Sequence, residues 1–270
     1  RGERALRDAI AVTLDRDRQA TYDPVTEILV TSGATLGIAA TLTTLIAEGD
    51  GVLLPDPVYD AYRSPILLAG GEIQPVTGTI AGGRFTITAA ALEAAITPRS
   101  RLLLLNTPWN PTGTVFTRSE LEAIGDVVLR HDLILVSDEI YEAIVYDGHR
   151  HVSPASLSPA LRARTVIVNS LSKTYAMTGW RVGYCAGPAA IIQPLFLVLQ
   201  QSSRGPSTFV QDAAATALLG SQDCVEEMRR TYASRLESVI AALADLPRVR
   251  VLRPEGGFFA ILDVRDIGLP

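Results

Sequence analysis

The sequence predicts an α/β protein. Its large domain is expected to have three layers, α/β/α, around a mostly parallel sheet, followed by the beginning of a smaller α+β domain. Short, fully apolar segments such as Leu102–Leu105 alternate with amphipathic segments of helical spacing. Fully apolar strands are typical of parallel sheets, since helices bury both faces. A long amphipathic helix, predicted over Asp223–Leu246, leads into the smaller domain. We assign residues 1–236 to the large domain and 237–270 to an incomplete small domain.

The individual elements follow from local signals. Strands are expected at Glu27–Val30, Gly51–Leu54, Leu102–Leu105, Leu133–Val136, Val166–Val168, Val182–Ala186 and Phe258–Val264. Helices are expected at Glu3–Leu14, Ala34–Ile46, Tyr59–Leu68, 117–131 and Asp223–Leu246. Thr117 is predicted to cap its helix, because Glu120 three residues later completes a capping box.

Composition excludes several classes of protein. The 270 residues are 47% hydrophobic and 20% charged, and the net charge of −5 comes without basic runs, which argues against nucleic-acid binding. Apolar runs stay shorter than the ~20 residues of a membrane helix, and the charged start is unlike a signal peptide. Two cysteines cannot form a disulfide framework. We therefore expect a cytoplasmic protein. Because the chain starts within a predicted helix and stops soon after a predicted strand, we expect a fragment or a longer chain with unseen ends.

Polar side chains follow three predicted strands at their carboxyl ends. They are Asn106 and Asn110, Asp138, and Asn169 with Ser170. Because open α/β sheets bind ligands beyond the carboxyl ends of their strands, we expect one binding site on this rim.

Lys173 lies just beyond the third of these strands. A lysine beside a buried acidic group can form a Schiff base, because desolvation lowers its pKa and leaves a free amine. The alternative is a surface lysine in a salt bridge. Asp138 has two interpretations as well: a charge partner for a cofactor nitrogen, or a cap for a helix over Glu139–Glu142.

The turn Ser32-Gly33-Ala34-Thr35 joins a predicted strand to a predicted helix. Such a turn presents free backbone N–H groups to an anion. Arg181 and Ser170 could add a guanidinium and a hydroxyl to the same phosphate.

Three segments together resemble a known family. They are Asn106–Gly113 (NTPWNPTG), Ser137–Tyr141 (SDEIY) and Ser170–Tyr184 (SLSKTYAMTGWRVGY). Their order and spacing resemble the class I/II aminotransferases, fold type I enzymes that depend on pyridoxal phosphate, and among these the subgroup of many bacterial aspartate and aromatic aminotransferases. The resemblance extends from Arg1 through Gly256-Gly257-Phe258-Phe259.

The resemblance implies a role for each residue of the site. Lys173 would form the Schiff base and move the proton between the substrate Cα and the cofactor C4′, and Asp138 would pair with the pyridine nitrogen. Tyr141, with Asn110, would bind the phenolic oxygen, and Tyr59 would stack on the ring. The phosphate would be held by Gly33, Ala34, Thr35, Ser170, Ser172 and Arg181. Lys173, Asp138 and Tyr141 are the predicted catalytic residues.

The implied activity is transfer of an amino group between an L-amino acid and a 2-oxo acid by a homodimer. Two alternatives stay open: a pyridoxal-phosphate-dependent lyase or cyclase, and a ligand-sensing domain of a transcription regulator. Full-length relatives carry an N-terminal segment over the substrate and an arginine that grips its α-carboxylate. We assign neither feature to this chain, and Arg265 does not take that arginine's role. The resemblance leaves the amino acid and the oxo acid undefined.

Several other residues receive simpler interpretations. His149 and His151 are expected to be exposed rather than metal ligands, and no metal site is expected. Arg204 is interpreted as a surface arginine, the alternative being contact with a substrate carboxylate or the cofactor phosphate. Packing roles are assigned to Tyr62, Phe85, Trp180 and Cys185.

Overall fold

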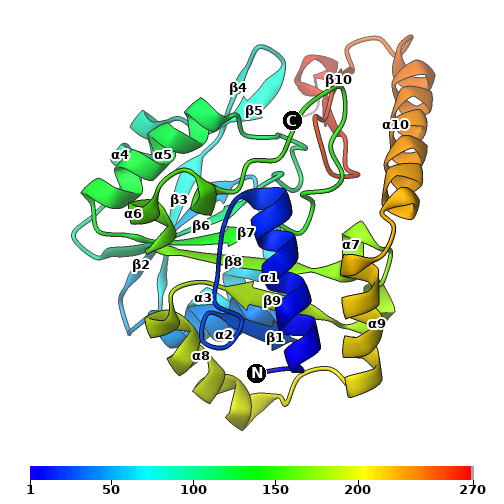
Figure 1. The fold of residues 1–270 in the computed structure, drawn as a ribbon. Coiled ribbons are helices and arrows are strands. Elements are labelled where there is room, and N and C mark those ends of the chain that lie inside the picture. The colour runs from blue at the N-terminus through cyan, green and yellow to red at the C-terminus, as the bar shows by residue number, and fades with distance from the viewer. Residues whose placement is uncertain (269–270) are drawn as a thin grey trace.

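The computed structural model describes residues 1–268; Leu269 and Pro270, the last two residues of the predicted small-domain segment, lie outside this range. Within it, seven strands form one sheet in the order β1-β9-β8-β7-β6-β2-β3 (Figure 1). The strands are β1 (Ile28–Thr31), β2 (Gly51–Asp56), β3 (Glu72–Thr77), β6 (Ser100–Asn106), β7 (Ile134–Asp138), β8 (Thr165–Ser170) and β9 (Gly183–Ala186). β9 pairs antiparallel with β1 and β8, whereas the other pairs are parallel, so the mostly parallel sheet is confirmed.

Helices cover both faces of this sheet. Successive side chains of a strand point to opposite faces, and in β6 both sets are apolar and need to be buried. Leu102 and Leu104 of β6 belong to a core cluster with residues of α2 (Ala34–Leu45), α3 (Arg63–Leu68) and α8 (Ala189–Ser202). Leu103 and Leu105 pack on the other face. That face is covered by α1 (Arg4–Arg18), α4 (Ala89–Ala95), α5 (Arg118–Arg130), α6 (Pro159–Arg162) and α9 (Thr208–Leu219). The predicted three-layer architecture is confirmed.

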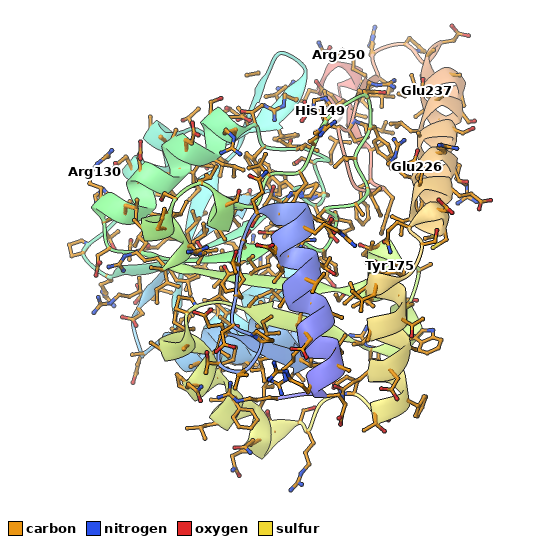
Figure 2. All side chains as sticks on the ribbon, in the orientation of Figure 1. Arg130, His149, Tyr175, Glu226, Glu237 and Arg250 are labelled. Atoms are coloured by element: carbon orange, nitrogen blue, oxygen red, sulfur yellow. The ribbon has the colours of Figure 1, made fainter. Side chains whose placement is uncertain are left out.

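The C-terminal part leaves the sheet along α10 (Asp223–Leu243), which Figure 1 shows at one side of the molecule beside β10. β10 (Arg250–Leu252) pairs antiparallel with β11 (Ile261–Asp263). Glu237, labelled in Figure 2, lies on α10. It forms an ion pair with Arg253, which directly follows β10. The domain boundary that we propose between residues 236 and 237 falls within α10. Among residues 1–268, no helix is both long and apolar enough to cross a membrane.

Most of the helices and strands predicted from local sequence signals are present in the structure. The capping box is confirmed: the Thr117 hydroxyl accepts from the Glu120 backbone N–H at 3.2 Å, and Glu120 Oε2 accepts from the Thr117 N–H at 2.8 Å. The strand predicted at Phe258–Val264 is too long, because Phe258 and Phe259 pack edge-on against Tyr141 instead of entering β11.

Other elements differ from the predictions. The helix predicted at Tyr59–Leu68 divides into a 3₁₀ turn, η1 (Asp60–Tyr62), and α3. β3, α8 and α9 were not predicted, nor was the hairpin of β4 (Thr79–Ala81) and β5 (Arg84–Thr86).

Candidate active site

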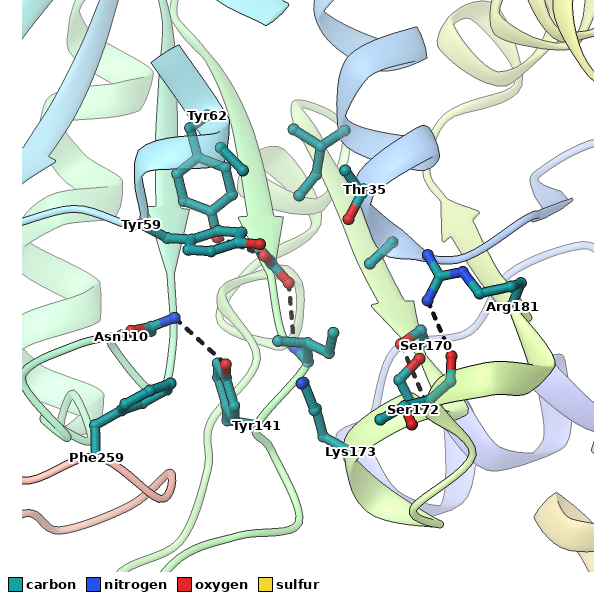
Figure 3. Close-up of a pocket in the computed structure, with 16 residues that line it drawn as sticks. Thr35, Tyr59, Tyr62, Asn110, Tyr141, Ser170, Ser172, Lys173, Arg181 and Phe259 are labelled. Atoms are coloured by element: carbon teal, nitrogen blue, oxygen red, sulfur yellow. Dashed lines mark hydrogen bonds between the residues drawn. The ribbon is translucent and has the colours of Figure 1, made fainter. Parts of the chain in front are cut away.

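A cavity of about 250 Å³ opens beyond the carboxyl ends of β6, β7 and β8. These strands are neighbours in the sheet, so Asn110, Asp138 and Ser170 meet in one cavity as predicted. Asn106 does not line this cavity, and Asn169 lines a different one. Every predicted site residue except Gly33 lines the cavity, and Figure 3 shows Lys173, Tyr141, Asn110, Tyr59 and Arg181 around it. The lining residues are Ala34, Thr35, Ile38, Tyr59, Ala61, Tyr62, Asn110, Asp138, Ile140, Tyr141, Ser170, Ser172, Lys173, Thr178, Arg181 and Phe259.

Asp138 is the last residue of β7 and its carboxylate is buried at the base of the cavity. Its Oδ2 accepts a hydrogen bond from the Tyr62 hydroxyl at 2.5 Å, and its Oδ1 accepts from the Ile140 backbone N–H at 3.2 Å. Burial raises the pKa of the Asp138 carboxyl to about 6, because desolvation of the charge outweighs these two hydrogen bonds. Residues 139–142 form a turn rather than a helix, so the helix-cap interpretation is wrong.

Tyr62 is a site residue that the sequence analysis missed. It was assigned to packing, and it is indeed buried, but it also lines the cavity and holds Asp138. A tyrosine three residues after Tyr59 on a turn gives no sequence signal for this contact. The contact joins residues 76 positions apart in the sequence, and the tertiary structure alone brings them together.

Burial of Asp138 predicts a measurable change of stability in the cofactor-free protein. The pKa of Asp138 is above its usual 3.8, so the stability it contributes is present below that value and is lost as pH rises through about 6. Asparagine has no charge to bury. We expect Asp138→Asn to gain up to about 3 kcal/mol in free energy of unfolding, relative to wild type, between pH ~4 and pH ~8. Urea unfolding at several pH values measures this difference, and a constant difference would contradict it.

Lys173 lies on the short helix α7 (Leu171–Thr174), directly after β8. It lines the cavity with its side chain half-buried, and its Nζ lies 5.2 Å from the centre of the Phe258 ring. Within residues 1–268 its amine enters no salt bridge, contrary to the surface interpretation. Lys173 is also the single lysine of the 270-residue sequence.

Asn110 and Tyr141 form the side of the cavity opposite Arg181 (Figure 3). Asn110 Nδ2 donates to the Tyr141 hydroxyl at 3.3 Å. Asn106 fixes this loop, since its Nδ2 donates to the Asp138 carbonyl and its Oδ1 accepts from the Asn110 N–H. Burial, and then the charge of Asp138, raise the pKa of Tyr141, which keeps its hydroxyl protonated.

The other end of the cavity is built to receive an anion. α2 begins at Ala34, directly after Gly33, whose φ of +87° favours glycine. The first N–H groups of α2 have no carbonyl partners within the helix. A Cβ on Gly33 would lie 2.5 Å from the Arg181 guanidinium, and a Cβ on Gly183 would lie 2.8 Å from the Gly33 backbone. Because Gly33 and Gly183 have no side chain, Arg181 can lie close to the helix N-terminus. Ser170 and Ser172 add hydroxyl groups beside it.

A family model for class I and II aminotransferases matches residues 1–267 of the chain. The chain belongs to this family. The aspartate aminotransferase of Geobacillus stearothermophilus is 40% identical over 262 residues, which are 97% of this chain and 66% of that protein. The arginine–pyruvate transaminase of Pseudomonas aeruginosa is 41% identical over 271 residues, 100% of this chain and 67% of the relative.

Solved structures agree with this assignment. The N-succinyldiaminopimelate aminotransferase of Mycobacterium tuberculosis superposes with a TM-score of 0.95 at 35% identity, covering 100% of this chain and 70% of its own. The aromatic aminotransferase of Pyrococcus horikoshii gives a TM-score of 0.96 at 39% identity, and the match covers 99% of this chain and 72% of that one. This member of the class I and II aminotransferases thus spans about two thirds of the length of the curated relatives it matches.

The class I and II aminotransferases use pyridoxal phosphate, and the residues of the cavity fit this cofactor. The anion cradle at α2 suits the phosphate, and the buried Asp138 carboxylate suits a protonated ring nitrogen. The Tyr59 ring forms one wall and packs edge-on against Tyr62, with 5.4 Å between ring centres. Lys173 supplies an amine that is free of salt bridges within residues 1–268.

Several other expectations about this aminotransferase-family chain are resolved by the structure. Arg204 is exposed and lines a different cavity, together with Arg1. The exposed position expected for His151 is wrong: its side chain is 6% exposed, because Nε2 bonds the buried Glu139 at 3.0 Å. Trp180 is 47% exposed, so its packing role is wrong too. Phe85 packs against Trp109, and Cys185 is buried, as predicted.

Proposed function

We propose that this chain carries the cofactor site of an aminotransferase that moves an amino group between an L-amino acid and a 2-oxo acid. The observation that supports this most is the convergence of three groups in one cavity: the Lys173 amine, the buried Asp138 carboxylate and the anion cradle at α2.

Pyridoxal phosphate, when bound, supplies an aldehyde for the amino group and a ring that withdraws electrons from the substrate Cα. Asp138 would keep the ring nitrogen protonated through an ion pair that is strong because the carboxylate is buried. Gly33, Ala34, Thr35, Ser170, Ser172 and Arg181 would hold the phosphate. Asn110 and Tyr141 would donate to the phenolic oxygen, and Tyr59 would cover one face of the ring.

Lys173 has two proposed tasks. Its Nζ would hold the cofactor through the aldehyde group, and it would move the proton at the substrate Cα. Its helix begins at Ser170, whose hydroxyl accepts from the Ser172 N–H at 3.2 Å and thereby fixes the segment that carries Lys173. Both tasks require the amine in its neutral form.

We further propose a homodimer in the cytoplasm, with the large domain over residues 1–236 and the small domain starting at 237. Closed twofold dimers are the commonest assemblies among homo-oligomeric proteins. Cys185 and Cys224 are both free cysteines, which supports a reducing compartment.

Half-reactions test the proposed function. Protein loaded with pyridoxal phosphate is mixed with L-aspartate, L-arginine, L-glutamate and aromatic amino acids in turn. We expect one of them to convert the cofactor's visible absorbance to that of pyridoxamine phosphate, and a 2-oxo acid to restore it. Release of ammonia or of a cyclised product would instead indicate a lyase or cyclase. Binding without conversion would indicate a sensor.

A further inference from the structure

Each of the three proposed catalytic residues is followed in the sequence by a residue whose side chain faces away from the cavity. Asp138, Tyr141 and Lys173 are each followed in the sequence by a polar residue. These followers are Glu139, Glu142 and Thr174. Glu142 and Thr174 line a second cavity, of about 430 Å³, while Glu139 is completely buried beside it.

One arginine connects these followers. Arg18, near the end of α1, has a side chain that is 5% exposed. Its Nε lies 3.4 Å from Glu139 Oε2, and one terminal nitrogen lies 3.0 Å from Glu142 Oε1. The Thr174 hydroxyl donates to the same Glu142 Oε1 at 3.0 Å. A continuous set of buried and partly buried polar contacts therefore joins the segments that carry Asp138, Tyr141 and Lys173.

We propose that Arg18, Glu142 and Thr174 are positioning residues that fix Lys173 relative to Tyr141 and Asp138 from the rear of the site. This inference rests on the proposed function. Each follower shares a peptide bond with the residue it positions, so a shift of Thr174 against Glu142 moves Lys173 against Tyr141. Misplacement of a reacting group by about 1 Å can cost about 10²-fold in rate. The Arg18 and Glu139 side chains are almost fully buried, where polar contacts are stronger than in water.

Thr174→Val removes the contact between the two segments while preserving side-chain volume. Thr174→Ser restores the hydroxyl. Thr13→Val is the matched control: Thr13 is also buried and lines the same second cavity, but its hydroxyl donates to the Ala9 carbonyl within α1 at 2.8 Å. A general effect of losing a buried hydroxyl appears equally in Thr174→Val and Thr13→Val.

The readout is covalent capture of pyridoxal phosphate by Lys173, trapped with borohydride at increasing times and cofactor concentrations. We expect Thr174→Val to lower the maximal first-order rate about tenfold, with an unchanged half-saturating concentration, because the phosphate and ring contacts are untouched. Thr174→Ser and Thr13→Val should stay within about twofold of wild type, and the thermal midpoints of Thr174→Val and Thr13→Val should fall alike.

If wild type captures the cofactor but Thr174→Val and Thr13→Val capture it at equal maximal rates, this inference is overturned and the proposed function stands. A Thr174→Ser variant that stays as slow as Thr174→Val would overturn this inference as well. A wild-type protein that captures no cofactor at Lys173 would overturn both proposals.

Discussion

Lys173→Ala is expected to abolish covalent capture of pyridoxal phosphate and to lower the rate of amino-group transfer about 10⁴-fold or more. In the proposed function the amine is both the group that holds the aldehyde and the base at the substrate Cα, and positioned proton transfer alone contributes about 10²–10⁴-fold. The sequence holds no second lysine that could substitute for it. Stopped-flow absorbance with the amino acid identified in the half-reaction panel measures the loss.

Lys173→Arg serves as the control for charge and length. A guanidinium stays protonated at all accessible pH values, so it places a long cationic side chain near Phe258 that neither binds an aldehyde nor accepts a proton. We expect it to be as inactive as the alanine variant. Substantial transfer by either variant would show that another group performs the chemistry.

Asp138→Asn is expected to lower the rate of amino-group transfer about 10²–10⁴-fold. A neutral amide cannot stabilise a proton on the cofactor ring nitrogen, and the ring then withdraws electrons from the substrate Cα poorly. The carboxylate's buried position, with Tyr62 and Ile140 as hydrogen-bond donors, leaves its charge available to the cavity. Steady-state kinetics on the loaded protein, with saturation by cofactor verified, measure the effect.

The same substitution is expected to gain stability relative to the wild-type, cofactor-free protein as pH rises from about 4 to above 6. Lower activity together with higher stability would distinguish a functional carboxylate from a structural one, since loss of a structural group lowers both. Asp126→Asn, the same chemical change at an exposed position of α5, is the matched control and should alter stability by no more than about 0.5 kcal/mol. An active Asp138→Asn variant would contradict the proposed ion pair with the ring nitrogen.

Sequence patterns predicted the sheet and its rim because both depend on local information. Continuous apolar runs such as Leu102–Leu105 mark strands buried on both faces, and polar residues directly after them mark strand ends. The antiparallel direction of β9 was not predictable in this way, because strand direction depends on how the chain returns to the sheet.

The contacts behind the site could not be predicted at all. Arg18 on α1 reaches Glu139 and Glu142 across more than a hundred residues of sequence, and Tyr62 reaches Asp138 from a neighbouring turn. His151 was misjudged for the same reason: its partner is the buried Glu139. Long-range pairing of polar groups leaves no periodicity in the sequence.

The assignment of Lys173 as the cofactor's amine is tested most directly by borohydride reduction followed by digestion with a protease that cuts after lysine. Lys173 is the single lysine, so untreated protein should yield two fragments. After loading with pyridoxal phosphate and reduction, the account predicts an uncleaved chain that carries one cofactor, attached at Lys173. Complete cleavage, with the cofactor absent or attached to the amino terminus, would contradict the assignment.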